Sequence, residues 1–251
     1  MATVSRAYIE QFAQQNTVLT EAMKNQLAQM LDGIDTSQRE TIRSIVYYVL
    51  KPYTDMAASL AARFYNGIRQ ASGVPNDYEA TAQGSFDRGF LDQRTDEVLD
   101  EVEQGRNTVP RDELLGNMAG AFVKDASDNS IRINARKDPA KPRYAIVPNG
   151  KACAFCVMRA SLGYHYPDKA AIRSHHACTC VATPVFRGAK VEGYDPQGYL
   201  DQYEQAAKAL KSGDLPDEIK ERLEAQKAEK GRDFDRTKQI LLVMRYQQGI
   251  S

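Results

Sequence analysis

The chain has 251 residues, 42% of them hydrophobic, and its 33 lysines and arginines balance 33 aspartates and glutamates. This length is enough for one large domain or two small ones with a buried core. The zero net charge excludes a global attraction to nucleic acid or an anionic membrane, and leaves one local basic cluster as a candidate DNA contact or a solvated linker. The members of that cluster are Arg132, Arg136, Lys137, Lys141 and Arg143.

The N-terminal residues and the cysteines indicate the compartment. Residues 1–20 mix charges with glutamines and lack the apolar segment of a secretory signal. No stretch approaches the roughly 18 apolar residues that a membrane-spanning helix needs. We therefore expect folding in a cytosol, with no membrane contact. All four cysteines lie between positions 153 and 180, and in a reducing compartment such clustering favours metal ligands or redox groups over disulfides.

Residues 1–129 have the apolar spacing of helices. Ser37 and Glu40 predict a capping box at a helix start, and Pro52 predicts the end or a kink of that helix. Leu114, Leu115, Met118, Phe122 and Val123 form the apolar stripe of a helix that begins after Pro110. The other expected helices cover residues 17–31, 55–70 and about 80–103.

Residues 130–192 change in character. Short runs rich in β-branched residues predict strands at 131–134, 144–147 and 181–187, and the cysteines lie between the last two. The C-terminal residues 193–251 return to a helical pattern. Asp195 and Pro196 predict an N-cap and a first helical position. A solvent-facing helix follows at 217–230, and a last helix at 234–246 carries an apolar run that must dock on the body or meet a partner.

The cysteines and two histidines form a candidate zinc site. Tetrahedral zinc takes four sulfur or nitrogen ligands, so six candidates compete for four places. The candidates are Cys153, Cys156, Cys178, Cys180, His175 and His176.

We favour the four cysteines as the ligand set, and the alternative replaces Cys178 or Cys180 with a histidine. If residues 176–180 are extended, alternate side chains share a face, which groups His176 with both cysteines. A turn before Cys178 would bring His175 round instead. The choice of histidine therefore stays open.

The predicted zinc is structural. His165, His175 and His176 are the only histidines, and none belongs to the H-x-E motif of zinc deaminases or the H-E-x-x-H motif of metallopeptidases. Four protein ligands leave zinc no open position for water or substrate. A redox C-x-x-C requires a strand–helix context and leaves the second cysteine pair unexplained. An HNH-like nuclease requires a histidine after the motif, and none follows Cys180. We therefore expect no enzymatic activity.

The motif region resembles the MuF-like minor capsid (head morphogenesis) proteins of phages and prophages of actinobacteria. The resemblance is specific over about residues 130–200, and family members often carry a histidine at the position of His175. The matching segments are Arg143–Pro148, Cys153–Tyr164, His175, Cys178–Cys180 and Pro184–Phe186, with Asn134, Arg136 and Asp138 upstream and Tyr194–Pro196 downstream.

The resemblance implies a virion protein of the procapsid interior, synthesised in the bacterial host cytoplasm. It implies a role near the portal in procapsid assembly and DNA packaging or delivery. The implied partners are the portal protein, the major capsid protein or both, with packaged DNA as a further candidate and no small-molecule substrate. Many members carry an additional C-terminal enzyme domain, but the residues after the motif are too few and too helical for one. A zinc-containing nucleic-acid-binding protein or an HNH-like nuclease is the alternative function.

The predicted fold class is therefore α+β, in three parts. Residues 1–129 form a mainly helical region for partner docking. Residues 130–192 form a small β-containing module that a Zn²⁺ ion stabilises, since a structural metal contributes its binding energy to the folding of a small region. Residues 193–251 form a helical C-terminal tail.

Overall fold

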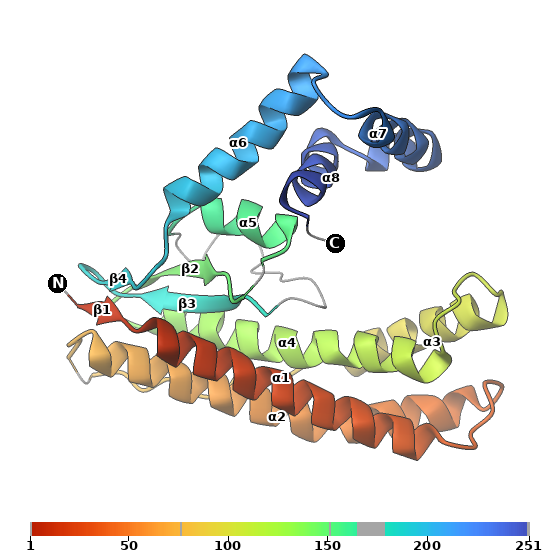
Figure 1. Cartoon of the computed structure of the whole chain (residues 1–251). Coiled ribbons are helices and arrows are strands. Elements are labelled where there is room, and N and C mark those ends of the chain that lie inside the picture. Colours follow the sequence, from red (N-terminus) through yellow and green to blue (C-terminus); the bar gives the residue numbers. More distant parts are fainter. Residues whose placement is uncertain (1, 76, 151, 165–178, 250–251) are drawn as a thin grey trace. The chain divides into compact units, whose positions relative to one another are not determined.

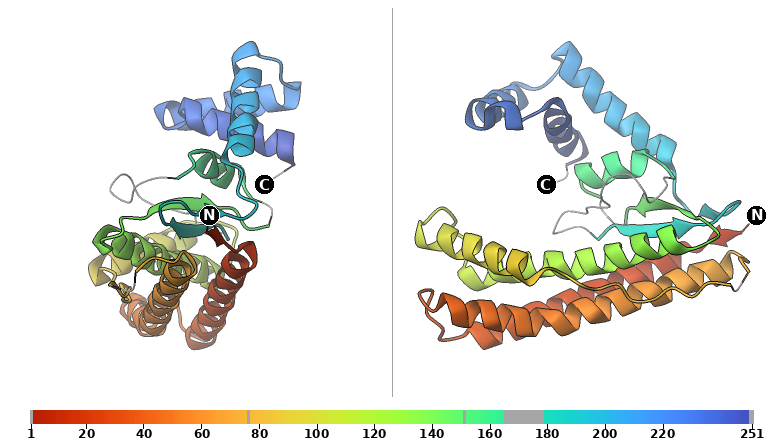
Figure 2. Two further views of the ribbon diagram at one scale, coloured as in Figure 1. Left: turned by 90° about the vertical axis from the view of Figure 1, so that its left-hand side faces the viewer. Right: turned by 180° about the vertical axis from the view of Figure 1, so that it is seen from behind.

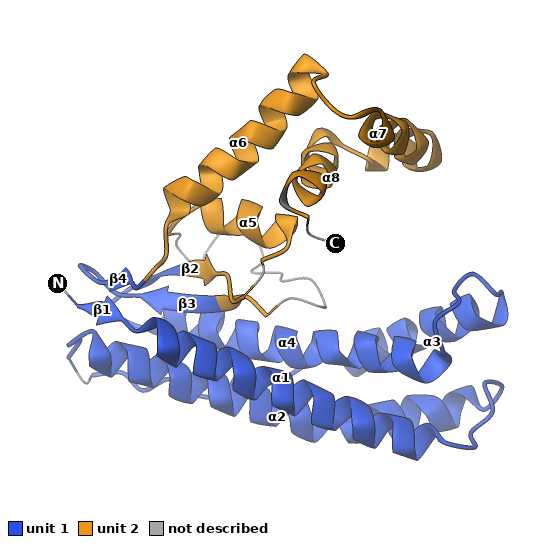
Figure 3. Ribbon diagram, in the orientation of Figure 1, with its two compact units in different colours: residues 1–144, 166–177, 182–192 blue, residues 145–165, 178–181, 193–251 orange. Residues whose placement is uncertain are grey.

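The structure is a computed structural model that describes residues 2–75, 77–150, 152–164 and 179–249. It divides into two compact units (Figure 3). Unit 1 comprises residues 1–144, 166–177 and 182–192, and unit 2 comprises residues 145–165, 178–181 and 193–251. The structure is mostly helical with few strands, which agrees at a coarse level with the predicted α+β class. No described helix is both long and apolar enough to cross a membrane. The three-part division at residues 129 and 192 stays a prediction.

Four helices dominate unit 1 (Figure 1). They are α1 (Arg6–Leu31), α2 (Arg39–Ala71), α3 (Arg88–Glu103) and α4 (Arg111–Lys137). Apolar residues at helical spacing on each of them meet in one core, as the sequence predicted for α4. The core includes Met23, Leu27, Leu31, Ile42, Val46, Val49, Leu50, Ala57, Leu91, Leu99, Leu115, Met118 and Val123.

Two glycines of α4 lie against side chains of α1. A Cβ added at Gly120 would lie 3.1 Å from Thr20 Cγ2, and one added at Gly116 would lie 3.4 Å from Lys24 Cγ. Glycine in a helix interior costs about 1 kcal/mol relative to alanine. At Gly120 that cost is offset by the space it leaves for α1, whereas at Gly116 a methyl group fits.

The helix α2 continues through Pro52, where the sequence predicted a kink or an end. The predicted end is wrong, because α2 runs without a break from Arg39 to Ala71, and the kink stays a prediction. Buried residues flank the proline on both sides, with Leu50 before it and Ala57 after it, while Pro52 itself is exposed. Burial of this continuous stripe outweighs the cost of about 3 kcal/mol that proline brings to a helix interior.

The strand predicted at residues 131–134 is also wrong, because these residues belong to α4. Ser127, Ile131, Asn134 and Ala135 are all buried, at the spacing of one helix face. The short β-branched run suggested a strand because the buried face of this helix includes polar side chains. A pattern of hydrophobic residues alone does not reveal such a face as helical.

Two helix starts differ from their predicted positions, and the start of α2 lacks the predicted cap. α1 begins at Arg6, well before residue 17. α2 begins at Arg39 without a side-chain cap, because Ser37 donates to Asp35 Oδ1 at 2.6 Å and makes no capping box. α3 begins only at Arg88, where the Asp87 carboxylate accepts from Phe90 N at 2.6 Å, while residues 78–87 form neither helix nor strand.

The strands form two small sheets. β1 (Thr3–Val4) pairs in parallel with β4 (Lys190–Val191), with Thr3 opposite Lys190. β2 (Arg143–Val147) and β3 (Val181–Val185) form the second sheet and confirm the strands predicted at 144–147 and 181–187.

Unit 2 contains the remaining helices (Figure 2). They are α5 (Ala154–Ser161), α6 (Pro196–Ser212), α7 (Asp217–Lys230) and α8 (Arg236–Gln248), with a short 3₁₀ turn before α8. The predicted helix at 217–230 and the helix start at Pro196 are confirmed. The apolar run of the last helix docks within the unit, where Ile240, Leu241, Leu242, Val243 and Met244 are buried against α5 and α6 residues.

Candidate functional site

The first cysteine pair lies at the start of α5. Gly150, which follows Pro148 and Asn149, adopts a φ of 62°, the left-handed conformation that glycine accepts readily. Cys153 is the N-cap residue of α5, and Cys156, 2% exposed, lies in its first turn. Side chains at the N-cap and three residues later lie close enough to interact, as they do in a capping box. The sequence did not predict this helix, but its start brings the two side chains to one end of α5.

The second cysteine pair is described only at Cys180. Cys180 is 3% exposed and directly precedes β3. Beside it, Thr179 Oγ1 donates to the carbonyl of Asn149 at 3.0 Å, across 30 residues of sequence. This bond joins the segment of the second pair to the turn that precedes the first pair, and all of these residues belong to unit 2.

The predicted ligand set is not assembled within the described part of the chain. Cys178, His175 and His176 lie outside the described residues, as does His165. Among the residues that the structure does describe, no three Cys, His, Asp or Glu side chains gather closely enough to hold a metal ion. Zinc binding, and the choice between the two histidines, therefore stay predictions.

The C-x-x-C motif has the local context of a redox motif. β2 precedes it and α5 begins within it, so the strand–helix transition that thioredoxin-like motifs need is present. The strand–helix context therefore does not speak against a redox role. Only the second cysteine pair does, because a two-cysteine redox motif does not require it.

Tyr194 ties α5 to the start of α6. Its hydroxyl donates to the carbonyl of Ala160 at 2.6 Å, and its ring centroid lies 5.5 Å from that of Tyr164. Burial raises the pKa of the Tyr194 phenol well above its ordinary value. Asp195 then caps α6 by accepting from Gly198 N at 3.1 Å, which confirms the predicted N-cap. The residues after β4 thus fix the C-terminal end of the helix that carries the first cysteine pair.

A buried ion pair joins α2 to the end of α4 in unit 1. We call it the Arg69 cluster, after its central residue. Arg69 Nε donates to Asp138 Oδ2 at 2.9 Å, and the two side chains are 3% and 0% exposed. Tyr65 Oη donates to the same carboxylate oxygen at 2.9 Å, and Ala140 N donates to Oδ1 at 2.9 Å. Burial, with the neighbouring carboxylate, raises the pKa of the Tyr65 phenol far above its ordinary value.

The same arginine holds the segment that follows α2. Its Nη1 donates to the carbonyl of Pro75, and its Nη2 pairs with the Asp77 carboxylate. Asn134 of α4 clamps the next part of the segment, because its amide donates to Thr81 O at 2.8 Å and accepts from Thr81 N at 3.0 Å. These contacts give Asn134 and Asp138, two positions of the sequence motif, a structural role in the core. The motif indicated these two positions but not Arg69 or Tyr65, since their pairing joins residues far apart in sequence.

Three members of the basic cluster have a local role in α4. Arg136 and Lys137 lie in the last turn of α4, where positive charge complements the helix dipole. Arg132 donates to Asn129 Oδ1 at 3.0 Å on the same helix. DNA contact through this cluster stays a prediction.

Comparison with protein families identifies the chain. The family model described as VG15 protein matches residues 3–206, which include both cysteine pairs, the Arg69 cluster and most of α6. The chain therefore belongs to the VG15 family, a family of phage genes, and is a phage protein. α7 and α8 lie beyond the matched residues. No curated protein and no solved structure matches the chain.

Proposed function

We propose that this VG15-family phage protein is a minor capsid (head morphogenesis) protein that acts near the portal in procapsid assembly and in DNA packaging or delivery. The observation that carries the proposal is the MuF-like sequence motif of residues 130–200. It lies within a chain that belongs to a phage-gene family, whose model matches residues 3–206. The proposed partners are the portal protein, the major capsid protein or both, and packaged DNA is a secondary candidate. The proposed role is non-enzymatic and lies inside the virion.

A structural zinc ion is part of the proposal. The thiol donors fit zinc, and Cys153, Cys156 and Cys180 all belong to unit 2. The fourth ligand would be Cys178, or a histidine would take the place of one member of the second pair. When bound, zinc would supply a closed four-ligand crosslink between the start of α5 and the segment before β3. The hydrogen bond from Thr179 to Asn149 already joins the neighbouring backbone, so a crosslink here would add to a contact that the chain makes itself.

The helical unit supports an assembly role through its internal rigidity. The Arg69 cluster and the Asn134 clamp use buried, mutually satisfied polar groups, which favour one core arrangement over alternatives. Such a unit can present fixed surfaces to a partner. The proposal therefore assigns partner docking to unit 1 and metal binding to unit 2.

Co-purification and genetic complementation together test the proposed function. The tagged chain is co-expressed with the portal and major capsid proteins of the same phage, and particles are then isolated. We expect association with the portal or with portal-containing procapsids. In a phage that lacks the gene, we expect fewer DNA-filled heads, restored by the wild-type chain and not by Cys153→Ser. Normal heads without the gene, together with no association, would contradict the proposal.

The alternative functions have a separate assay. Plasmid DNA is incubated with the wild-type chain and with His175→Ala in the presence of Mg²⁺ or Mn²⁺. Cleavage by the wild-type chain alone would replace the assembly role with nuclease activity. Filter binding of DNA at rising salt tests the basic cluster, because phosphate contacts weaken steeply with ionic strength.

A further inference from the structure

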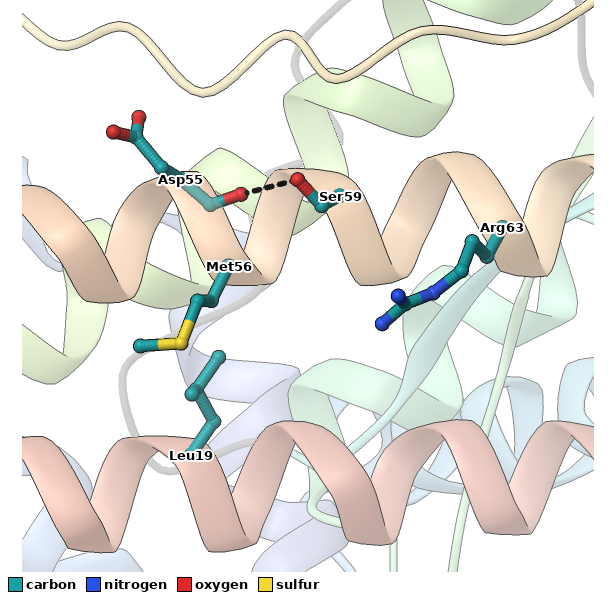
Figure 4. Close-up of a pocket in the computed structure, with 5 residues that line it drawn as sticks. All are labelled: Leu19, Asp55, Met56, Ser59 and Arg63. Carbon is teal, nitrogen blue, oxygen red and sulfur yellow. Dashed lines mark hydrogen bonds between the residues drawn. The ribbon is translucent and has the colours of Figure 1, made fainter.

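The outer face of α1 and α2 in unit 1 is hollowed (Figure 4). A cavity of about 470 Å³ lies between Leu19 of α1 and Asp55, Met56, Ser59 and Arg63 of α2. A second hollow of about 160 Å³ continues along the same two helices and shares Arg63. We call the two hollows together the α1–α2 groove.

The surface around the α1–α2 groove lacks the charges of an ordinary solvent-facing helix. Between Glu10 and Glu21, α1 carries no charged residue, although several of its glutamines and Val18 are exposed. Val18 is 63% exposed and Met56 is 45% exposed. The exposed side chains here are uncharged, glutamines together with Val18 and Met56, and depletion of charge with enrichment in methionine distinguishes the core of a protein interface. The groove therefore has the chemistry of a contact surface.

Two charges of opposite sign stand on either side of this uncharged centre. The Arg63 side chain lines both hollows and makes no ion pair or hydrogen bond with the described residues. Asp55 lines the first hollow and pairs with Lys51, one turn away on the exposed surface. Arg63 follows Asp55 by eight positions, a rise of about 12 Å along the helix, so the two cannot pair within one chain.

Ser59 lies midway between the two charges along α2. Its hydroxyl donates to the carbonyl of Asp55 at 2.8 Å, which satisfies it within the helix. Because this side chain is small and its hydroxyl is already hydrogen-bonded, another helix can approach closely at this point. The face is thus arranged symmetrically about Ser59, with one charge of each sign at equal distances.

We propose that the α1–α2 groove is a dimer interface that binds a second copy of this chain. A two-fold axis that lies in the plane of this face and passes beside Ser59 would place α2 antiparallel to its counterpart. Arg63 then meets Asp55 of the partner subunit, and the same pair forms a second time across the axis. This self-complementarity is the property that a two-fold interface requires. The uncharged surface of α1 meets its own copy without like-charge repulsion.

Charge reversal tests this dimer directly. Arg63→Glu alone, or Asp55→Lys alone, would place like charges opposite each other twice. We expect each variant to associate about 30-fold more weakly than the parent chain, the equivalent of about 2 kcal/mol. An equimolar mixture of the two variants restores both opposite-charge pairs and should dimerise again. Sedimentation equilibrium over a range of concentrations measures the association of the parent chain, of each variant and of their mixture.

Two controls make the result interpretable. Arg94→Glu reverses an exposed arginine of α3 outside the groove, next to Glu97, and should leave the dimer unchanged. Circular dichroism of each variant checks that the helices remain folded. A parent chain that stays monomeric, or a folded mixture that fails to associate, would overturn the proposal. So would a monomeric chain whose Arg63→Glu variant loses its association with the portal protein, since the groove would then belong to that partner. The test does not depend on zinc or on the proposed capsid role.

Discussion

Removing the Asp138 carboxylate should destabilise unit 1 more than any surface substitution. Asp138→Ala deletes the acceptor of Tyr65 Oη, Arg69 Nε and Ala140 N, three bonds of 2.9 Å in a site where Asp138 is 0% exposed. It leaves a guanidinium that is 3% exposed with Asp77, 61% exposed, as its remaining carboxylate. Breaking a buried ion pair from one side costs about 3–5 kcal/mol, because the other charge stays buried without compensation.

Urea unfolding followed by circular dichroism measures this loss. With an m-value of about 2 kcal/mol/M, a loss of about 4 kcal/mol lowers the unfolding midpoint by about 2 M. Glu97→Gln is the matched control, since its pair with Arg94 is about 40% exposed on both sides and should contribute less than about 1 kcal/mol.

A double substitution separates the ion pair from simple loss of packing. Arg69→Met combined with Asp138→Ala removes both charges, so the double variant should lose less stability than the sum of the two single variants. Tyr65→Phe should cost only about 1 kcal/mol, because the carboxylate keeps its other donors. If Asp138→Ala were as stable as Glu97→Gln, or if the two single effects simply added, the central role of the cluster would be refuted.

Three further predictions concern the helix contact, the pH dependence and the metal. Gly116→Ala should raise the unfolding free energy by up to about 1 kcal/mol, because the added methyl group fits against α1. Gly120→Leu should lower the unfolding free energy by about 1–3 kcal/mol, because the larger side chain pushes on α1. Urea unfolding midpoints measure both variants, and equal effects would contradict the contact. Because the pKa of Tyr194 is raised in the folded chain, its neutral phenol stabilises the fold fully below the unfolded pKa of about 10, and this stability is lost as the pH rises further. The difference in unfolding free energy between the parent and Tyr194→Phe should therefore shrink in alkaline unfolding experiments. A difference that stays constant with pH would contradict this prediction. Cys153→Ser should lose zinc from about one equivalent per chain, by elemental analysis, while most helical circular dichroism of residues 1–129 persists; unchanged zinc content would remove Cys153 from the ligand set.

Helices with local signals were predictable from the sequence, and helices held by distant contacts were not. Asp195 and Pro196 announce α6 because an N-cap and a first-turn proline act within a few residues. The helix end predicted at Pro52 and the strand predicted at 131–134 are wrong because burial against distant parts of unit 1 outweighs the local preference there. The continuous helix at both places follows from tertiary packing, which no short window of sequence contains.

The candidate site was predictable in its chemistry but not in its support. The clustering of the cysteines identified the thiol donors. The placement of Cys153 at a helix N-cap was not predicted, nor was the bond from Tyr194 to Ala160 that holds the other end of α5. The Arg69–Asp138 pair joins positions 69 residues apart, so only the folded chain reveals it.

We propose that this phage protein is built into the head during assembly. Quantitative mass spectrometry of purified procapsids and virions tests it most directly, with the portal protein as the internal standard. We expect peptides from both units in the procapsid. Their copy number should be similar to that of the portal protein and far below that of the major capsid protein. Absence of the chain from both particles, in lysates where it is expressed, would contradict the account.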